Sequence, residues 1–245
     1  MSDIDWKSVA MKSDHFVPLL KKSLSTLKIN KISETIRNNV FTIVFGTNNR
    51  KKGIELAELL APYNIEVRTL ADFDKQLDVV EDGATFLDNA RKKAVEQAKF
   101  LNAWVLGEDS GLGVDALDGA PGVYSARFAA LSDDKNSPDA DNNRLLLEKL
   151  ANVPLEERTA HYTSTVVLAD PSGAVRGETT GHCRGRILFV PSGEGGFGYD
   201  PLFEVVEYHR TFGTLPPVVK RTISHRARAM RKMIPVLRHA TEPDA

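Results

Sequence analysis

The sequence contains little cysteine and no long apolar run, and its net charge is close to zero. Its only cysteine, Cys183, excludes a disulfide within the chain and any zinc site built from several cysteines. No apolar stretch approaches the length of a membrane-spanning helix. A formal net charge of −1 argues against attraction of the whole surface to nucleic acid or membrane, although it does not exclude a local patch. We therefore expect a cytoplasmic protein, in a reducing compartment, with neither nucleic acid nor membrane among its partners.

Common targeting and nucleotide-binding motifs are also missing. The chain has no GxxxxGK[ST] loop and no GxGxxG motif. Its N-terminal segment is no signal peptide, because the apolar cluster is short and acids precede it. We find no internal repeat and no low-complexity tract. We interpret residues 1–39, which lack glycine, as a peripheral extension with short amphipathic helical turns, and residues 40–240 as one domain.

The remaining composition is that of a globular protein with a substantial core. The 245 residues are 42% hydrophobic and 27% charged. Residues 40–45 form a short β-branched and aromatic run typical of a buried strand, and a polar turn and a helical pattern follow up to Pro62. Strand, turn and helix in this order direct backbone N–H groups at an anion, and Lys51 and Lys52 add positive charge there. Asparagines that merely form a turn, with solvated lysines, are an equally weighted alternative for this segment.

A second strand and a capped helix come next. Residues 65–73 read as a strand, and Thr85 with Asp88 three residues on predicts the N-terminus of a helix. The apolar residues AWVL then predict a third short strand, which ends at the adjacent acids Glu108 and Asp109. Ligands of α/β sheets bind beyond the carboxyl ends of strands, so the polar turn and the acid pair fall at the same edge. The acids would hold a cation or activate a water molecule.

The second half of the sequence is richer in β-strand patterns. A turn at residues 170–173 separates predicted strands, and glycines then surround Phe197 and Tyr199. Glycine-rich backbone permits close approach to a flat ligand on which the aromatic rings could stack, and a simple bend with core aromatics is an equally weighted alternative. Ser224 predicts the N-cap of a basic C-terminal helix, for which a solvated face is the plainer interpretation.

These signals together suit a polyphosphate bound with Mg²⁺. The segments that carry them are TNNRKK, EDGATFLDNA, EDSGLGVDALDGAPGVYSARFA, GGFGYDPLF and KRTISHRARA. With these five motifs in order, the chain from about Thr42 to Leu237 resembles the inosine/xanthosine triphosphate pyrophosphatase family, whose members hydrolyse non-standard purine nucleoside triphosphates.

The resemblance implies a role for each matching residue. Asp109 matches the family's proton acceptor and a metal-associated carboxylate. Glu81 matches a second metal-linked acid, with Glu108 as an alternative ligand. The residues that match substrate contacts come from four segments. They are Thr47, Asn49 and Lys52 of the phosphate turn; Ser110 beside Asp109; Phe197, Gly198, Tyr199 and Asp200 of the base-binding loop; and Lys220, His225 and Arg226.

The resemblance also implies a fold, a cofactor and an assembly. The expected fold is an elongated, two-lobed α/β structure with a mixed, strongly twisted sheet and a cleft between the lobes. The expected cofactor is Mg²⁺, and the expected assembly is a homodimer. The expected reaction is hydrolysis of ITP, dITP or XTP to the monophosphate and pyrophosphate, which keeps these nucleotides out of nucleic acids.

Other functions are compatible with parts of the sequence. A pyrophosphatase for modified pyrimidine triphosphates is the alternative enzyme, since a similar sheet and acid cluster could serve it. A nucleic-acid-binding protein would explain the basic C-terminal helix but not the acids. A nucleotide-binding module without catalysis would not need Glu81, Glu108 and Asp109, all of which are present.

Overall fold

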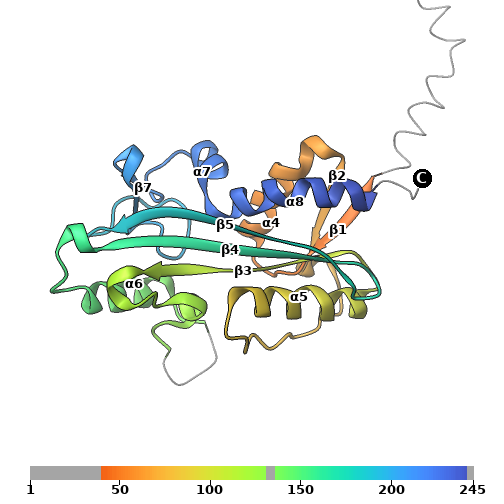
Figure 1. Ribbon diagram of the computed structural model, residues 1–245, viewed down its shortest axis with the longest axis horizontal. Coiled ribbons are helices and arrows are strands. Elements are labelled where there is room, and N and C mark those ends of the chain that lie inside the picture. Colours follow the sequence, from red (N-terminus) through yellow and green to blue (C-terminus); the bar gives the residue numbers. More distant parts are fainter. Residues whose placement is uncertain (1–39, 131–135, 242–245) are drawn as a thin grey trace, which may run out of the picture. The chain divides into compact units, whose positions relative to one another are not determined.

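A computed structural model of the chain describes residues 40–130 and 136–241. The interpretation of residues 1–39 as a helical extension lies outside these described residues. From Thr42 onward the chain forms one compact unit around a seven-stranded mixed sheet, in the order β2-β1-β3-β4-β5-β6-β7 (Figure 1). The strands are β1 (Phe41–Phe45), β2 (Ile65–Thr69), β3 (Val105–Val114), β4 (Thr159–Ala169), β5 (Val175–Ile187), β6 (Phe203–Val205) and β7 (Arg210–Thr211).

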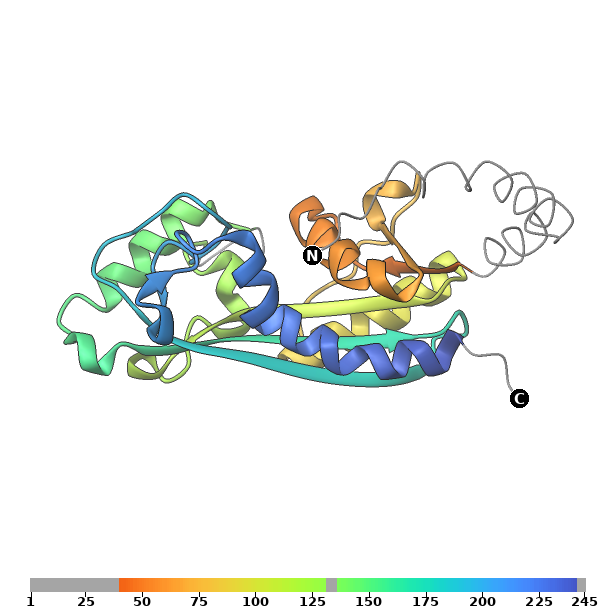
Figure 2. The ribbon, with the colours of Figure 1, turned by 90° about the horizontal axis from the view of Figure 1, so that it is seen from above.

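Helices cover both faces of this sheet (Figures 1 and 2). Helix α8 (His225–Thr241) packs on β4 and β5, while α5 (Phe86–Leu101) packs on the opposite face of β3 and β4. The other α-helices are α4 (Arg50–Leu60), α6 (Asp139–Lys149) and α7 (Pro217–Ile223). Short 3₁₀ helices are η1 (Ala61–Tyr63), η2 (Leu70–Asp72), η3 (Asp115–Leu117), η4 (Gly122–Arg127), η5 (Leu155–Glu157) and η6 (Val206–Tyr208). Within residues 40–130 and 136–241, no helix has both the length and the apolar character needed to cross a membrane.

Strand β3 is longer than the sequence pattern predicted. It pairs with β4 in antiparallel register over its whole length, from Val105 to Val114. The prediction that the strand ends at Glu108 and Asp109 is therefore wrong, because this pairing continues the strand through both acids. Parallel β1, in contrast, pairs with β3 only as far as Leu106. The edge of β3 beyond Leu106 is thus free of β1, on the side where a ligand could approach.

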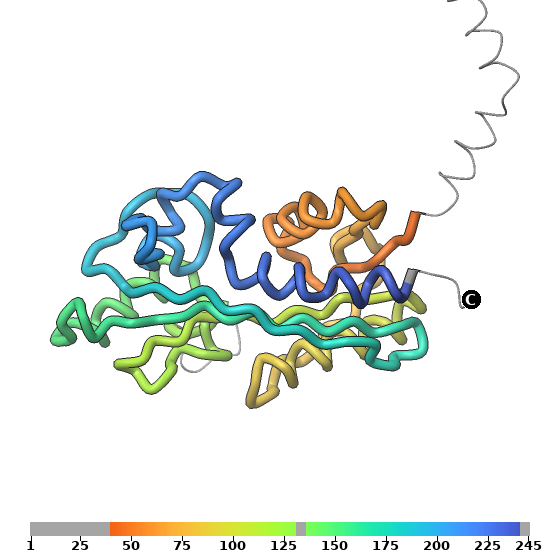
Figure 3. The backbone as a smooth tube through the Cα atoms, turned by 45° about the horizontal axis from the view of Figure 1, so that its top comes forward, coloured from red at the N-terminus to blue at the C-terminus, as the bar shows by residue number. Residues whose placement is uncertain are grey.

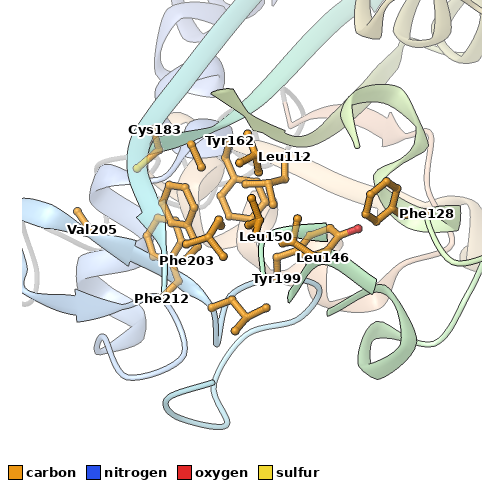
Figure 4. Packing of buried hydrophobic residues seen from close by; sticks show 14 of the residues in the cluster. Leu112, Phe128, Leu146, Leu150, Tyr162, Cys183, Tyr199, Phe203, Val205 and Phe212 are labelled. Atoms are coloured by element: carbon orange, nitrogen blue, oxygen red, sulfur yellow. The ribbon is translucent and has the colours of Figure 1, made fainter. Parts of the chain in front are cut away.

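Two hydrophobic clusters pack against different parts of the sheet. One contains Leu112, Leu146, Tyr199 and Phe203 and lies at the end of the sheet that carries α6, β6 and β7 (Figure 4). The other is formed by α5, β1, β3 and β4, around residues such as Ala94. Each cluster forms a core on its own part of the sheet. The expected α/β class with a mixed sheet is confirmed, and the sheet is not closed.

The locally encoded helix starts are confirmed. Thr85 and Asp88 form a reciprocal capping box at the start of α5. The Ser224 hydroxyl accepts from the amide of Ala227 at 3.2 Å, as expected of the N-cap of α8. Helix α6 was not predicted, since its N-cap is Pro138, which makes no side-chain capping bond.

The β4–β5 turn provides a pH-dependent prediction. Asp170 accepts from the Ser172 hydroxyl at 2.6 Å and from Arg176 Nε at 2.6 Å, and these partners lower its pKa from 3.8 to about 2. Because the folded pKa lies below the ordinary value, the stabilisation is complete above about pH 4 and is lost as the pH falls toward 2. The loss of one of these hydrogen bonds lowers the free energy of unfolding by about 1 kcal/mol, which corresponds to a fall of about 2–4 °C in Tm.

We therefore expect Asp170→Asn to lower Tm at pH 7 by that amount, with the two proteins converging in acid. Thermal unfolding between pH 7 and 2.5 measures the difference. A constant gap across this range would contradict the assignment.

Candidate active site

One cleft runs along the free edge of β3, with a volume of about 1020 Å³. All the site residues expected from the sequence line this cleft: Thr47, Asn49, Lys52, Glu81, Glu108, Asp109, Ser110, Phe197, Gly198, Tyr199, Asp200, Lys220, His225 and Arg226. They come from segments far apart in the chain. Figure 3 shows how the chain brings α4 and the start of α8 side by side. Their shared location is a finding, while their individual roles remain predictions.

The turn before α4 forms one wall of the cleft. Asn49 is the N-cap of α4, where its side chain accepts from the amide of Lys52 at 3.2 Å. The Thr47 hydroxyl accepts from the amide of Asn49 at 3.1 Å. These side chains fix the turn, so the positive end of the helix dipole and the Lys52 ammonium face the cleft. Lys52 Nζ also donates to the Ser110 hydroxyl at 3.3 Å.

Glu108 lies on the α8 face of β3 and is surrounded by cations. Its carboxylate accepts from Arg226 Nε and from the Ser164 hydroxyl, each at 2.8 Å, and pairs with Lys52 Nζ at 3.1 Å. Burial alone would raise the pKa of Glu108, but Arg226 and Lys52 more than offset it and hold the pKa well below its usual range. Arg226 has a second partner in Glu55, at 2.7 Å. Glu108 is therefore the ionised counter-ion of the buried Arg226 and the half-buried Lys52.

Asp109 points to the opposite face of β3, because successive side chains of a strand alternate. It accepts from Asn89 Nδ2 at 3.0 Å and pairs with Lys93 Nζ at 3.3 Å. Burial raises the pKa of Asp109 above its ordinary value, and Lys93 and Asn89 oppose this only in part. A raised pKa makes a carboxylate a stronger base, as proton abstraction from water requires.

Lys93 joins the two acids that were expected to hold a metal. Its ammonium pairs with Glu81 at 2.9 Å as well as with Asp109. Burial would lower the pKa of Lys93, but Asp109 and Glu81 more than offset it, so the pKa is raised and the side chain is charged.

Neither Lys93 nor Asn89 was predicted from the sequence. A signal for them does exist in α5, where Asn89, Lys93 and Gln97 recur every four residues beside the alanine face. Asn89 and Gln97 are both buried, which marks the stripe as one that faces the protein.

Two strand glycines let helices approach the sheet at the site. A Cβ on Gly107 would overlap the carbonyl oxygen of Ala90 and lie 2.6 Å from the amide of Ala94. A Cβ on Gly181 would overlap the carbonyl oxygen of His225 in the same way. The glycine before the acid pair thus permits the close packing of α5 that brings Lys93 to Asp109.

Gly107→Ala is expected to lower both stability and activity. The added methyl group meets backbone atoms of α5, which cannot move aside as a side chain would, and overpacking of this kind costs about 1–3 kcal/mol. Displacement of α5 also moves Lys93 away from Asp109. Chemical denaturation and steady-state kinetics measure the two effects. Gly46→Ala is the control for stability, because its methyl group would come no closer than 3.3 Å to another atom. Gly46 itself lines the cleft, so the comparison is restricted to unfolding, and an equal loss of stability in the two variants would contradict the packing argument.

The glycine-rich loop forms the far end of the cleft. Asp200 accepts from the Phe197 amide at 2.9 Å and from Lys220 Nζ at 2.5 Å. Lys220 Nζ also lies 4.6 Å from the centroid of the half-buried Phe197 ring. Tyr199 is 3% exposed and donates to the carbonyl of Ser125 at 2.9 Å, so its ring is a core side chain that also borders the cleft.

The basic C-terminal segment is divided between the cleft and solvent. Lys220, His225 and Arg226 are buried at the cleft. Burial and the neighbouring Arg226 lower the pKa of His225 well below its ordinary value, so the imidazole is neutral, and it stacks on Tyr162. The sequence pattern placed only the outer residues of this helix in solvent, and that is confirmed for the exposed Arg228, Arg231 and Lys232.

The acids at the cleft fit a divalent cation that also binds phosphate. Glu81 and Asp109 already share one positive charge, the Lys93 ammonium. Mg²⁺ binds one or two carboxylates and completes its shell with water and phosphate oxygens, so two acids suffice. Within the described part of the chain, no cluster of three or more His, Cys, Asp or Glu side chains is arranged to hold a metal alone. The donor set therefore suits a cation that arrives with a ligand.

A carboxylate pair beside lysine, arginine and a helix N-terminus defines an α/β protein with a site for a phosphorylated ligand and a cation. The chain belongs to the Ham1 family, whose model matches residues 43–236. The family resemblance recognised in the sequence is thereby confirmed.

Several relatives are similar to this chain over most of their length. The dITP/XTP pyrophosphatase of Rhodopirellula baltica is 52% identical over 200 residues, which cover 82% of this chain and 94% of that protein. The dITP/XTP pyrophosphatase of Desulforamulus reducens is 48% identical over 195 residues, or 80% and 94% of the two chains. Among solved structures, a HAM1 protein from Coxiella burnetii superposes with a TM-score of 0.72 at 35% identity, covering 81% of this chain and 99% of that one. The Staphylococcus aureus Ham1 protein gives 0.70 at 34% identity, with the same coverage.

Proposed function

We propose that this protein hydrolyses non-standard purine nucleoside triphosphates, such as dITP, ITP and XTP, to the monophosphate and pyrophosphate. The observation that carries the proposal is the cleft, in which acids and cations lie together: Glu108 pairs with Lys52, and Asp109 pairs with Lys93 on the other face of β3. Family membership and relatives named dITP/XTP pyrophosphatase support the same reaction. They do not favour the alternative of a pyrimidine-specific enzyme.

The residues divide the chemistry between the two faces of β3. Asp109 accepts a proton from the water that attacks the α-phosphorus, and Asn89 and Lys93 keep its carboxylate oriented. Lys52, Lys220 and Arg226 offset negative charge on the phosphates and on the pyrophosphate leaving group. Glu108 keeps Lys52 and Arg226 in place before the nucleotide arrives.

We propose Mg²⁺ as the metal, held by Glu81 and Asp109. When bound, it would neutralise phosphate charge and acidify a water molecule. Lys93, which pairs with both acids, would then give up part of this pairing.

Base selection follows from the hydrogen-bonding pattern of the purine. Hypoxanthine and xanthine carry an acceptor at position 6, where adenine carries a donor amine. Donors from His225, Arg226 or the loop backbone favour the oxo base, and an unpaired buried donor costs about 1–3 kcal/mol, roughly a factor of 5–150. Guanine has the same 6-oxo group, so its exclusion needs a separate interaction near position 2.

A substrate panel tests the proposal. With Mg²⁺ present, ITP, dITP and XTP should release pyrophosphate in preference to ATP, GTP, CTP and UTP, and chelation of the metal should abolish turnover. Release of orthophosphate, or equal turnover of ATP, would reject it.

We further propose that residues 40–240 form the catalytic domain and that two copies associate as a homodimer, as the family resemblance implies. Light scattering of the full-length chain measures the assembly, and a monomer at micromolar concentration would reject the dimer.

A further inference from the structure

The base-binding loop is tied to helix α6 at a single residue, Gly198. The amide of Gly198 donates to Asp139 Oδ2 at 2.7 Å, and its carbonyl accepts from Asn143 Nδ2 at 3.1 Å. Asp139 and Asn143 are four residues apart, so their side chains lie on one face of α6. Adjacent turns of α6 therefore hold both the backbone N–H and the backbone C=O of Gly198.

Gly198 depends on these hydrogen bonds for its position. Its φ of +62° lies in the left-handed region that favours glycine. A Cβ built on it would meet no heavy atom within 4 Å, so the loop is loosely packed on that side. The two hydrogen bonds to α6 are thus the contacts of Gly198 itself that fix the backbone at this point.

Helix α6 is a firm anchor for the loop. Leu146 and Leu150 are fully buried in the neighbouring core. Asn142 accepts from the amide of Ala129 at 2.8 Å and so attaches the helix to the segment after η4. The buried Arg158 donates to the carbonyl of Leu150 at 2.6 Å and holds the C-terminal end. A displacement of α6 relative to the cleft is therefore costly. Removal of the two bonds to α6 instead releases Gly198 locally, between the half-buried Phe197 and the core side chain of Tyr199.

Gly198 stands between two residues that border the base end of the cleft. Phe197 precedes it, with its ring beneath Lys220, and Asp200 follows two residues later and pairs with the same lysine. A shift of Gly198 changes the positions of the Phe197 ring and of the Asp200 carboxylate together. It leaves Asp109 and Lys52 in place, because these lie on β3 and α4.

We propose that Asp139 and Asn143 are positioning residues that set the selectivity for the purine base by fixing Gly198. This proposal rests on the proposed function, since it assigns the loop to base recognition. When a group that contacts the substrate is displaced by about 1 Å, a large part of its contribution to the reaction can be lost. The two side chains therefore act on the choice of base and leave phosphate chemistry intact.

Variants of α6 test this role. Asp139→Ala removes the acceptor, Asn143→Leu removes the donor at similar volume, and Asp139→Asn keeps an acceptor oxygen without the charge. Asp141→Ala is the matched control, because Asp141 is the other acid of the first helical turn and pairs with Arg144 on the surface. The measurements are kcat/KM for ITP and for ATP, with Tm recorded for each protein.

The expected result is a loss of selectivity at nearly unchanged chemistry. Asp139→Ala and Asn143→Leu should lower the ITP-to-ATP ratio of kcat/KM by about tenfold, the scale of a lost hydrogen bond involving a charged group. Asp139→Asn should recover most of the ratio, and Asp141→Ala should leave it unchanged. A purely structural role would instead lower kcat/KM for ITP and for ATP by the same factor, together with a fall in Tm.

The outcomes separate this proposal from the proposed function. If the unmodified protein does not prefer ITP to ATP, the proposed function fails and this role fails with it. If the unmodified protein prefers ITP and Asp139→Ala keeps the ratio, only the positioning role is overturned. Asp139 is exposed, so its variant should fold and carries the test even where Asn143→Leu does not fold. Asp139 lines the cleft whereas Asn143 is not among the lining residues, so an equal loss of the ratio in both variants assigns the effect to the position of Gly198.

Discussion

Asp109→Asn is expected to lower kcat by about 10²–10⁴-fold, the usual effect of losing a general base. The amide has the size of the carboxylate but cannot accept the proton from the attacking water. It also removes one of the two charges that Lys93 neutralises, so metal binding weakens as well. The measurement is kcat for ITP at saturating Mg²⁺, with Tm recorded in parallel.

Asp115→Asn is the control for this substitution. Asp115 follows the same strand, lies outside the cleft and accepts from the Thr159 hydroxyl at 2.6 Å, which an amide oxygen can also do. Its variant should keep full activity. A folded Asp109→Asn within about threefold of the unmodified protein, far less than a lost base costs, would remove Asp109 from the mechanism and leave it a structural role as the partner of Asn89 and Lys93.

Much of the fold was predictable because it is encoded locally. The cap of α5 by Thr85 and that of α8 by Ser224 depend on neighbours three residues away. The full length of β3 was not predictable, because Glu108 and Asp109 interrupt the apolar pattern that marks a buried strand. Their charges are compensated by residues distant in the chain, as Arg226 compensates Glu108. Such pairing is visible only once the chain has folded.

Helix α6 was missed for a related reason. It starts after Pro138 without a side-chain cap, and its apolar face is narrow. The residues that attach it to the rest of the molecule, Asn142 and Asn143, are polar and bond to backbone atoms of other segments. A pattern of apolar residues along one segment carries no information about such contacts.

The site was predictable as a set of residues but not as an arrangement. Motifs placed the acids and cations in one cleft, yet they did not separate Glu108 from Asp109. The structure places these adjacent acids on opposite faces of β3, where Glu108 meets Arg226 and Asp109 meets Lys93. Alternation along a strand explains this division, and it was not predicted because the strand was expected to end at these acids.

That division leads to the second large effect, in Glu108→Gln. Glu108 and Arg226 are each 4% exposed, and removing one partner of a buried ion pair costs about 3–5 kcal/mol. We expect the lower end of that range, because the amide oxygen of glutamine can still accept from Arg226 Nε. Chemical denaturation measures the change. Glu178→Gln is the control, since its pair with Arg91 lies at the surface and such pairs are worth less than about 1 kcal/mol.

The same variant distinguishes a counter-ion from a metal ligand. If Glu108 neutralises Lys52 and Arg226, an added polyanion takes over its function, and tripolyphosphate should restore most of the lost Tm. The Mg²⁺ concentration for half-maximal activity should stay unchanged, because Glu81 and Asp109 lie on the other side of the strand from Glu108. A large rise in that concentration at unaltered stability would instead assign Glu108 to the metal, as the family resemblance allowed. The contacts favour the counter-ion, since Arg226 and Ser164 donate to one oxygen of the carboxylate and Lys52 pairs with the other.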